Sequence, residues 1–198
     1  TLISMLMGRT FGLAEGDMLD LGVGALMHDV GKLDLPDRMR HREDHFSPAE
    51  QRLYEEHVAL GIAQARKMGL SAGASLVIAQ HHEHADGSGF PLRLNTDRMT
   101  ALSRIVALVN RYDNLCNPHI VTRAMTPHES LSMLFAQCKS KFDTAILGAC
   151  VTFLGCVSIE SVCRAIREDI PVRAEDNIAA AREAAAAVRI SELRKEAS

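Results

Sequence analysis

The chain has 198 residues, of which 47% are hydrophobic and 24% are charged. This length allows one domain of ordinary size, and the composition is globular, which excludes a disordered chain. The formal net charge of −3 at pH 7 excludes a generally basic surface for a nucleic-acid polymer. An anionic ligand would therefore need local cations or a metal ion.

Cysteine usage and the N-terminus bear on where the protein works. The five cysteines are odd in number and form no C-x-x-C pair, which indicates reduced, mostly buried thiols of an intracellular protein. The chain begins at Thr1 within an apolar pattern, so we expect a piece of a longer protein that is cut inside or just before a helix.

Apolar residues recur at helical spacing through nearly the whole chain, and no stretch alternates long enough to predict a sheet. The first helices are predicted over 2–11 and 18–28, and the second delivers His28 and Asp29 at its C-terminal end. Pro36 and the charged segment 37–45 predict a loop, which is either a solvated connector or a lid over a neighbouring site.

Two helix starts are unusually clear. Residues 47–50 and 126–129 each carry a capping residue, Pro at the first helical position and Glu at the third. Further helices are predicted over 48–69, 72–82, 100–115, 127–140, 144–157 and 159–169.

The last two features concern the C-terminal third. The uncharged run 144–159 is shorter than the roughly 20 apolar residues of a membrane span, so we predict a buried core helix there. The Ala-rich segment 175–196 has high helix propensity but a thin apolar stripe, which predicts an appended or partner-contacting helix. The fold class is therefore all-α, with a domain over 1–157 and a helical extension over 158–198.

Seven of the nine histidines lie between positions 28 and 84. Together with nearby acids they form a four-part constellation: 28–32 (HDVGK), His57, 81–83 (HHE), and Asn110 with Asp113. Imidazole and carboxylate suit Fe, Mn, Ni and Zn, and ligands from separate helices of a bundle commonly build such sites. His81 and His82 can face one centre only where their helix ends, and the Gly-rich segment 85–91 provides that end.

Asp29 is the natural bridging ligand, because each carboxylate oxygen can bind one of two ions. Two ions about 3.5–4 Å apart would generate hydroxide and stabilise in-line displacement at a phosphodiester. Lys32 would meet a phosphate oxygen as a point charge. Alone, a His-Asp pair is more often a cap or surface pair, and a loop with Gly87 and Gly89 is only a turn, so the prediction depends on the conjunction.

These residues resemble the HD-GYP domain family of bacterial cyclic di-GMP phosphodiesterases, a branch of the HD metallohydrolases. The resemblance covers about residues 2–155 and depends on 28–32, His57 with Gly61, and 81–91, supported by 103–107 and 124–127. It implies an HD-type bundle of about seven helices, to which the C-terminal helix is added, in the bacterial cytoplasm. It also implies a centre of two or three metal ions that hydrolyses cyclic di-GMP to linear pGpG or to GMP.

The resemblance implies a role for each matching position. His28 serves one metal, Asp29 bridges, and His57, His81 and His82 serve the second metal; the last carboxylate ligand of the family falls on Asn110. Asp29 and Lys32 are the candidate catalytic residues. The candidate substrate-binding residues are Lys32, Asp86, Gly87, Gly89, Arg104 and Arg123. The expected metal is Fe or Mn, with Ni and Zn as alternatives.

The chain departs from the family pattern at four places. The upstream His of the family would precede Thr1. Asn110 brings no negative charge, which weakens the first metal position; Asp113, one turn on, either substitutes as a ligand or makes a local hydrogen bond or ion pair. Phe90 replaces the signature Tyr. The basic residues expected after the last ligand appear as His119 and Thr122, with Arg123 adjacent.

Three functions follow as hypotheses. The first is a metal-dependent cyclic di-GMP phosphodiesterase. The second is a binding or scaffolding module with a degraded first metal position, which senses the dinucleotide or docks a GGDEF-type cyclase or another signalling protein. The third is an HD-type hydrolase of another nucleotide, against which the segment 86–91 argues. We expect no nucleic-acid polymer as partner and no membrane span.

Overall fold

The computed structural model describes residues 1–40 and 46–154 and, between 160 and 186, the isolated positions 160, 163–164, 167, 175–176, 178–179, 181–183 and 186. Up to residue 154 the described chain is helical, and its only β pairing is a single bridge between Asp86 and Asn95. The predicted all-α fold class is confirmed.

Seven α-helices lie within the described residues up to 154. They are α1 (Leu2–Thr10), α2 (Glu15–Met27), α3 (Pro48–Met68), α4 (Ala72–Gln80), α5 (Ala101–Cys116), α6 (Pro127–Cys138) and α7 (Thr144–Leu154). The predicted order is thus confirmed up to α7. The short 3₁₀ helices η1 (Val30–Asp34), η2 (Asp37–Met39), η3 (Thr96–Arg98), η4 (Val121–Arg123) and η5 (Lys139–Lys141) lie in the connections, where periodicity gave no signal.

The predicted capping signals form as expected. Ser47 Oγ accepts a hydrogen bond from the Glu50 backbone N–H, and Glu50 Oε2 accepts one from the Ser47 backbone N–H, at the start of α3. Thr126 and Glu129 form the same reciprocal pair before α6. At its other end α3 stops at Gly69, which adopts a left-handed conformation with φ of 68°. These local signals fix the long helix that carries His57.

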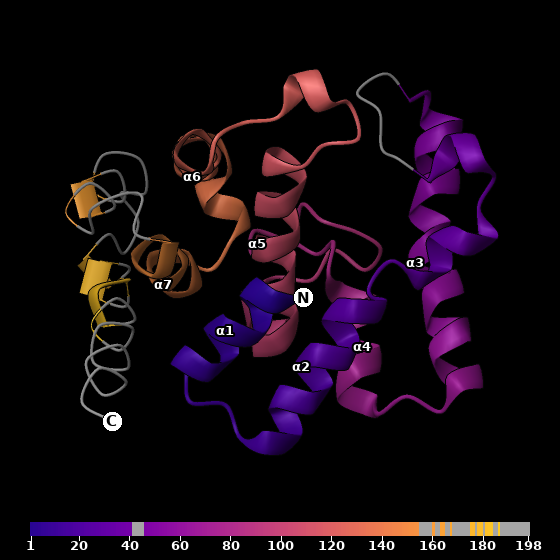
Figure 1. Cartoon of the computed structure of the whole chain (residues 1–198), viewed down its shortest axis with the longest axis horizontal. Helices are drawn as coiled ribbons and strands as arrows, with labels where there is room; N and C mark the ends of the chain where they lie inside the picture. The colour runs from indigo at the N-terminus through magenta and orange to yellow at the C-terminus, as the bar shows by residue number, and fades with distance from the viewer. Residues whose placement is uncertain are drawn as a thin grey trace.

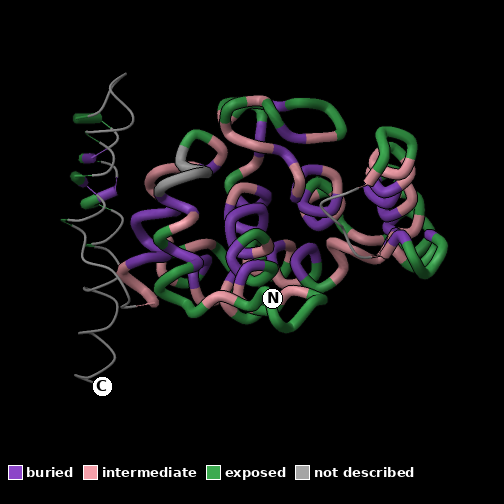
Figure 2. Tube along the Cα trace, turned by 90° about the horizontal axis from the view of Figure 1, so that it is seen from above, coloured by how far each residue is buried: buried purple, intermediate pink, exposed green. Residues whose placement is uncertain are grey.

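Helix α5 is the centre of the bundle (Figure 1). It packs against α1, α2, α4, α6 and α7, whereas α3 packs against α4 and the 3₁₀ helices η1 and η2. Buried residues follow the inward faces of these helices, and exposed residues lie on the outer turns (Figure 2). The core helix predicted from the uncharged run is α7, which buries its residues 146–151.

Two predictions fall wholly or partly outside the described residues. The C-terminal extension 158–198, with its helices 159–169 and 175–196, is described only at isolated positions, of which Cys163, Ile178 and Ala181 are buried. The connector or lid 37–45 is described only as far as residue 40. Among the described helices, none is long and apolar enough to cross a membrane.

Candidate metal centre

Four side chains from three separate segments converge where α2, α3 and α4 meet. Asp29 lies two residues beyond the end of α2, His57 lies in the middle of α3, and His81 and His82 directly follow α4. One ligand atom from each lies within 4.8 Å of the others. We call these four residues the Asp/His group. Helix α4 ends at Gln80 with His81 as its C-cap, and ligand atoms of both His81 and His82 reach the same centre.

Hydrogen bonds to the backbone fix the tautomers of the imidazoles. The Nδ1 atom of His57 lies 2.5 Å from the carbonyl oxygen of Tyr54, and that of His81 lies 2.8 Å from the carbonyl oxygen of Ile78. A carbonyl can only accept, so each Nδ1 carries the proton and each Nε2 presents a lone pair. His28 has the same arrangement, with its Nδ1 2.9 Å from the carbonyl oxygen of Ala25.

The lone pairs face one another without a donor between them. The Nε2 atoms of His57 and His81 are 3.4 Å apart, and each is 3.5 Å from Oδ1 of Asp29. Oδ1 of Asp29 and Nε2 of His82 are buried and have no hydrogen-bond partner. Buried acceptors without partners are costly, and a cation among them removes that cost. The residues therefore fit a transition-metal ion.

The two carboxylate oxygens of Asp29 face different residues. Oδ1 faces His57 and His81, whereas Oδ2 lies 2.7 Å from Nζ of Lys32 and 3.3 Å from Nε2 of His28. Nζ of Lys32 also lies 5.3 Å from the ring centroid of Tyr54, which adds a cation–π contact. The two oxygens therefore have different surroundings, and the bridging role of Asp29 stays a prediction.

The electrostatics of the group favour the protonation states that ligate metal. Burial lowers the pKa of His57 to about 4 and also lowers the pKa values of His81 and His82. Burial raises the pKa of Asp29, but the close contacts of its carboxylate with His28 and His81 and the charge of Lys32 outweigh burial and hold that pKa well below its usual range. Near neutral pH the imidazoles are therefore neutral and the carboxylate is ionised.

A close backbone crossing brings Asp29 to His57. A Cβ atom at Gly31 would lie 2.0 Å from the carbonyl oxygen of His57 and 2.4 Å from the backbone nitrogen of Gly61. Only glycine permits this approach of η1 to α3. Gly31 and Gly61 therefore allow the close approach that brings Asp29 and His57 together.

The ring of Phe90, which stands where the resembled family has Tyr, packs on the Asp/His group. It stacks on His82 with 4.6 Å between the ring centroids and 24° between the ring planes. Tyr54 packs against both His57 and Phe90, with 4.8 Å between the ring centroids of Tyr54 and His57. These aromatic contacts limit the rotation of both imidazoles.

The predicted ligands of α5 have local partners. Oδ1 of Asn110 accepts a hydrogen bond from Nδ2 of Asn114, and Oδ1 of Asp113 accepts one from Nδ2 of Asn117, each 2.9 Å long. Asn110 is half-buried and Asp113 is exposed. Of its two predicted roles, Asp113 therefore has the local hydrogen bond. Asp113 does not belong to the Asp/His group.

The predicted substrate-binding residues of the Gly-rich segment form a compact turn after α4. Oδ1 of Asp86 accepts a hydrogen bond from the backbone N–H of Ser88, and Gly87 has a positive φ of 76°. A Cβ atom at Gly89 would lie 2.5 Å from the carbonyl oxygen of His82, so this glycine lies directly against the ligand turn.

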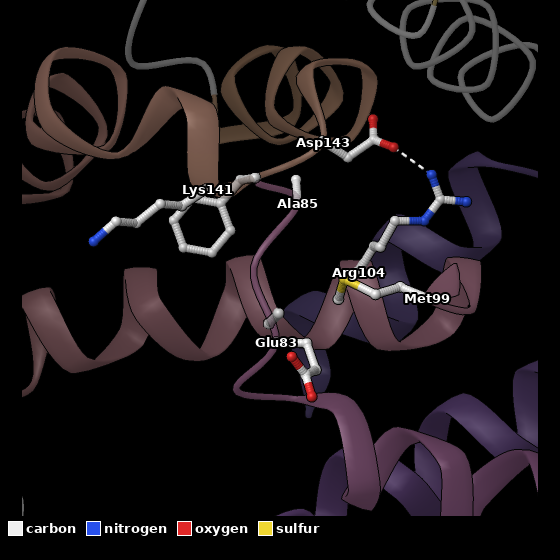
Figure 3. Close-up of a pocket in the computed structure, with 8 residues that line it drawn as sticks. Glu83, Ala85, Met99, Arg104, Lys141 and Asp143 are labelled. Carbon is white, nitrogen blue, oxygen red and sulfur yellow. Dashed lines mark hydrogen bonds and ion pairs between the residues drawn. The ribbon is translucent and has the colours of Figure 1, made fainter. Parts of the chain in front are cut away.

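The two predicted arginines lie in other surroundings. Arg104 lines a small pocket with Glu83, Met99 and Lys141. Figure 3 shows its guanidinium pointing to Asp143, with which it forms an ion pair. Asp143 also accepts hydrogen bonds from the first turn of α7, so Arg104 joins α5 to α7. Arg123 is exposed at the end of η4.

Sequence reasoning missed the role of two residues beside the group. Tyr54 accepts the His57 N–H through its carbonyl oxygen, and its position one helical turn before His57 could have indicated this. Glu83 is completely buried and accepts two backbone hydrogen bonds, from Leu92 and Leu94. Their spacing of nine and eleven residues has no sequence signature.

Comparison with known proteins gives one family and several relatives. A family model described as HD domain matches residues 2–146. The chain is 27% identical over 164 residues to the cyclic di-GMP phosphodiesterase response regulator RpfG of Xanthomonas campestris, covering 81% of this chain and 43% of that protein. It is 29% identical over 143 residues to 3′3′-cGAMP-specific phosphodiesterase 2 of Vibrio cholerae, covering 71% of this chain and 27% of that protein.

A third relative and one solved structure agree with these matches. The chain is 28% identical over 130 residues to a cyclic di-GMP phosphodiesterase of Thermotoga maritima, covering 61% of this chain and 35% of that protein. The solved structure is Bd1817, described as an HDG"Y"P protein from Bdellovibrio bacteriovorus, with a TM-score of 0.65 and 23% identity over 77% of this chain and 49% of that one. The chain spans less than half the length of these curated relatives.

Proposed function

The chain belongs to the HD domain family, and on that premise we propose that it is a metal-dependent phosphodiesterase that hydrolyses cyclic di-GMP in the bacterial cytoplasm. Relatives over most of this chain are named cyclic di-GMP phosphodiesterases, which supports the reaction class and the substrate. The proposed products are linear pGpG or GMP.

One observation carries the proposal. Oδ1 of Asp29 and the Nε2 atoms of His57 and His81 form a buried cluster of acceptors without a proton donor, and the buried Nε2 of His82 also has no partner. A fold stabilised only by its own contacts would pair these atoms. Such a cluster is what a divalent ion with nitrogen and oxygen ligands requires.

The proposed division of work follows the contacts. Asp29, His57, His81 and His82 are proposed to hold one ion. His28 and Oδ2 of Asp29 are proposed to hold a second ion, with Asn110 as a further ligand. When bound, a first-row divalent ion, proposed as Fe or Mn, supplies Lewis acidity and an activated water.

Lys32 is proposed to hold a non-bridging phosphate oxygen. Its ammonium lies 2.7 Å from Asp29 at the edge of the group. Burial lowers the pKa of Lys32, but Asp29 and Tyr54 outweigh burial and raise it, so the group stays charged and can donate to the phosphate. Asp86, Gly87, Gly89, Arg104 and Arg123 remain proposed substrate contacts.

The test is product analysis with purified, metal-loaded protein. Cyclic di-GMP is incubated with the chain in Mn²⁺ or Fe²⁺, and pGpG and GMP are separated by chromatography. Asp29→Ala and His57→Ala should lower the rate by at least a hundredfold, whereas the exposed residues Asp97 and His128 serve as matched controls in Asp97→Ala and His128→Ala. If the two group variants hydrolyse as fast as the parent, the assignment fails.

A binding or scaffolding module is the second proposed function, and two features favour it. Asn110 has an amide in place of a carboxylate and already bonds to Asn114, and the signature tyrosine is Phe90. Such a module would sense the dinucleotide or dock a GGDEF-type cyclase. Saturable binding of cyclic di-GMP without turnover in excess Mn²⁺ would favour it over the enzyme.

The same experiment also tests whether another cyclic dinucleotide is the substrate. Because two relatives are named 3′3′-cGAMP-specific phosphodiesterases, 3′3′-cGAMP is assayed beside cyclic di-GMP. A rate at least tenfold higher with 3′3′-cGAMP would keep the reaction class and change the proposed substrate.

A further inference from the structure

Glu83 is a buried carboxylate without a role in the mechanism above. It directly follows His82, and none of its surface is exposed. Its Oε1 accepts the backbone N–H of Leu92 at 2.7 Å, and its Oε2 accepts that of Leu94 at 2.8 Å. Hydrogen bonds to an ionised carboxylate are short and strong, and burying one without such partners would be costly. Glu83 therefore fastens the segment after the Gly-rich turn to the end of α4.

Two further contacts join the same segment to the ligand turn. The backbone N–H of Phe90 donates to the carbonyl oxygen of His82 at 3.1 Å, and the Phe90 ring stacks on the His82 ring. Gly89 lies so close that a Cβ atom there would be 2.5 Å from the Cα of Glu83. Residues 89–94 thus lie as one layer on residues 82–83.

The backbone of Arg93 shows that this attachment constrains the segment. Arg93 has a φ of 54°, and among the described residues no other non-glycine has a positive φ. It lies between the two backbone amides that Glu83 holds, and its side chain is exposed. A left-handed conformation is unfavourable for an arginine and persists only where the surroundings enforce it. The clamp by Glu83 is the enforcing contact.

We propose that Glu83 is a positioning residue that holds segment 89–94 against the metal-ligand turn, so that the Gly-rich loop is preformed for the cyclic dinucleotide. This inference rests on the proposed function. Glu83 acts through the segment, since its two oxygens are occupied by Leu92 and Leu94. Metal binding itself depends on the Asp/His group, in which the imidazoles of His57 and His81 are fixed by their own backbone hydrogen bonds.

Trypsin provides a direct test, because Arg93–Leu94 is a tryptic bond inside the clamped segment. Proteolysis of a transiently opened segment tracks the population of the open form. Glu83→Gln keeps one acceptor oxygen but places an amide N–H₂ against the other backbone N–H. We expect cleavage after Arg93 to become about tenfold faster, measured by mass spectrometry, with cleavage after Arg66 in α3 unchanged. Glu56→Gln, which removes an exposed charge from α3, is the matched control.

Ligand measurements separate positioning from metal binding. Glu83→Gln should raise KM for cyclic di-GMP about tenfold, change kcat by less than threefold, and leave the number of bound Mn²⁺ ions per chain unchanged. An unchanged cleavage rate after Arg93, or an equal rise after Arg66, would overturn the proposal. A loss of bound metal equal to that of His57→Ala would also overturn it.

Two points keep the test decisive. If circular dichroism shows that Glu83→Gln does not fold, Glu83→Asp, which keeps the charge but shortens its reach, is compared with the parent in the same assays. If the parent neither binds nor hydrolyses cyclic di-GMP, the proposed function fails, whereas the cleavage and metal measurements still decide whether Glu83 clamps the segment.

Discussion

Replacing Gly31 with alanine tests whether the crossing of η1 over α3 sets the metal site. The added Cβ would lie 2.0 Å from the carbonyl oxygen of His57 and 2.4 Å from the backbone nitrogen of Gly61, whereas ordinary contacts begin at 3.4 Å. Both clashing atoms belong to the backbone, so no side-chain rotation relieves them. We therefore expect η1 to move away from α3, because overpacking forces the backbone to shift.

The expected loss of stability follows from this overpacking. Inserting atoms into a packed core costs about 1–3 kcal/mol, and a backbone clash belongs at the upper end. For a chain of this size that corresponds to a fall in Tm of roughly 6–12 °C. Asp29 lies two residues before Gly31 and should move with η1, so we expect the affinity for Mn²⁺ to fall about 10–100-fold, as when the support of a metal ligand is removed.

The assay is thermal unfolding and Mn²⁺ titration of Gly31→Ala beside Gly16→Ala. A Cβ atom at Gly16 meets nothing within 4 Å, and this residue lies in the first turn of α2. Alanine should stabilise that helix by up to about 1 kcal/mol without touching the site. A parent-like Tm and Mn²⁺ affinity in Gly31→Ala would refute the reasoning; a lower Tm with parent-like affinity would show that the crossing stabilises the fold but does not position Asp29.

Three further outcomes follow from the structure. The pKa of His57 is about 4 in the folded chain against 6.5 in the unfolded chain, so protons bind the unfolded chain more tightly. The free energy of unfolding of the metal-free protein is therefore fully retained above pH 6.5 and falls by up to about 3 kcal/mol as the pH is lowered to 4. Urea unfolding should show a smaller pH dependence in His57→Asn. Arg93→Gly should raise Tm by relieving a left-handed residue worth about 1 kcal/mol, whereas Arg98→Gly should not. Asn110→Asp should bind a second Mn²⁺ ion more tightly in calorimetric titration, and equal affinity would exclude Asn110 as a ligand.

Much of the fold could be predicted because its signals are local. The capping boxes at Ser47 and Thr126 predict the starts of α3 and α6, and Gly69 predicts the end of α3. The start of α2 was placed three residues too late, because Ala14 offers no capping side chain and only Glu15 and Asp17 favour the helix N-terminus there. The comparisons confirm the resemblance to HD-GYP proteins that the segments 28–32 and 81–91 and His57 with Gly61 indicated.

The Asp/His group was accessible to sequence reasoning for a different reason. A lone histidine has many uses, but His57, His81 and His82 together with Asp29 are metal-ligating side chains from separate segments of a helical bundle. The surroundings of the group were not accessible, because they depend on where loops return. Glu83 accepts from residues nine and eleven positions on, and Arg104 pairs with Asp143 across the bundle.

The two carboxylate oxygens of Asp29 have different surroundings, and this difference explains why the same site supports two proposed functions, an enzyme and a binding module. On its Oδ1 side the acceptors of three histidines gather without a donor, so a cation completes that side. On its Oδ2 side the ammonium of Lys32 already supplies positive charge at 2.7 Å. A second dication there would face this ammonium, and Asn110 adds no negative charge to offset the repulsion. We therefore propose that a strong metal position lies on the Oδ1 side and a weak one on the Oδ2 side, and that the occupancy of the weak position decides between the two proposed functions.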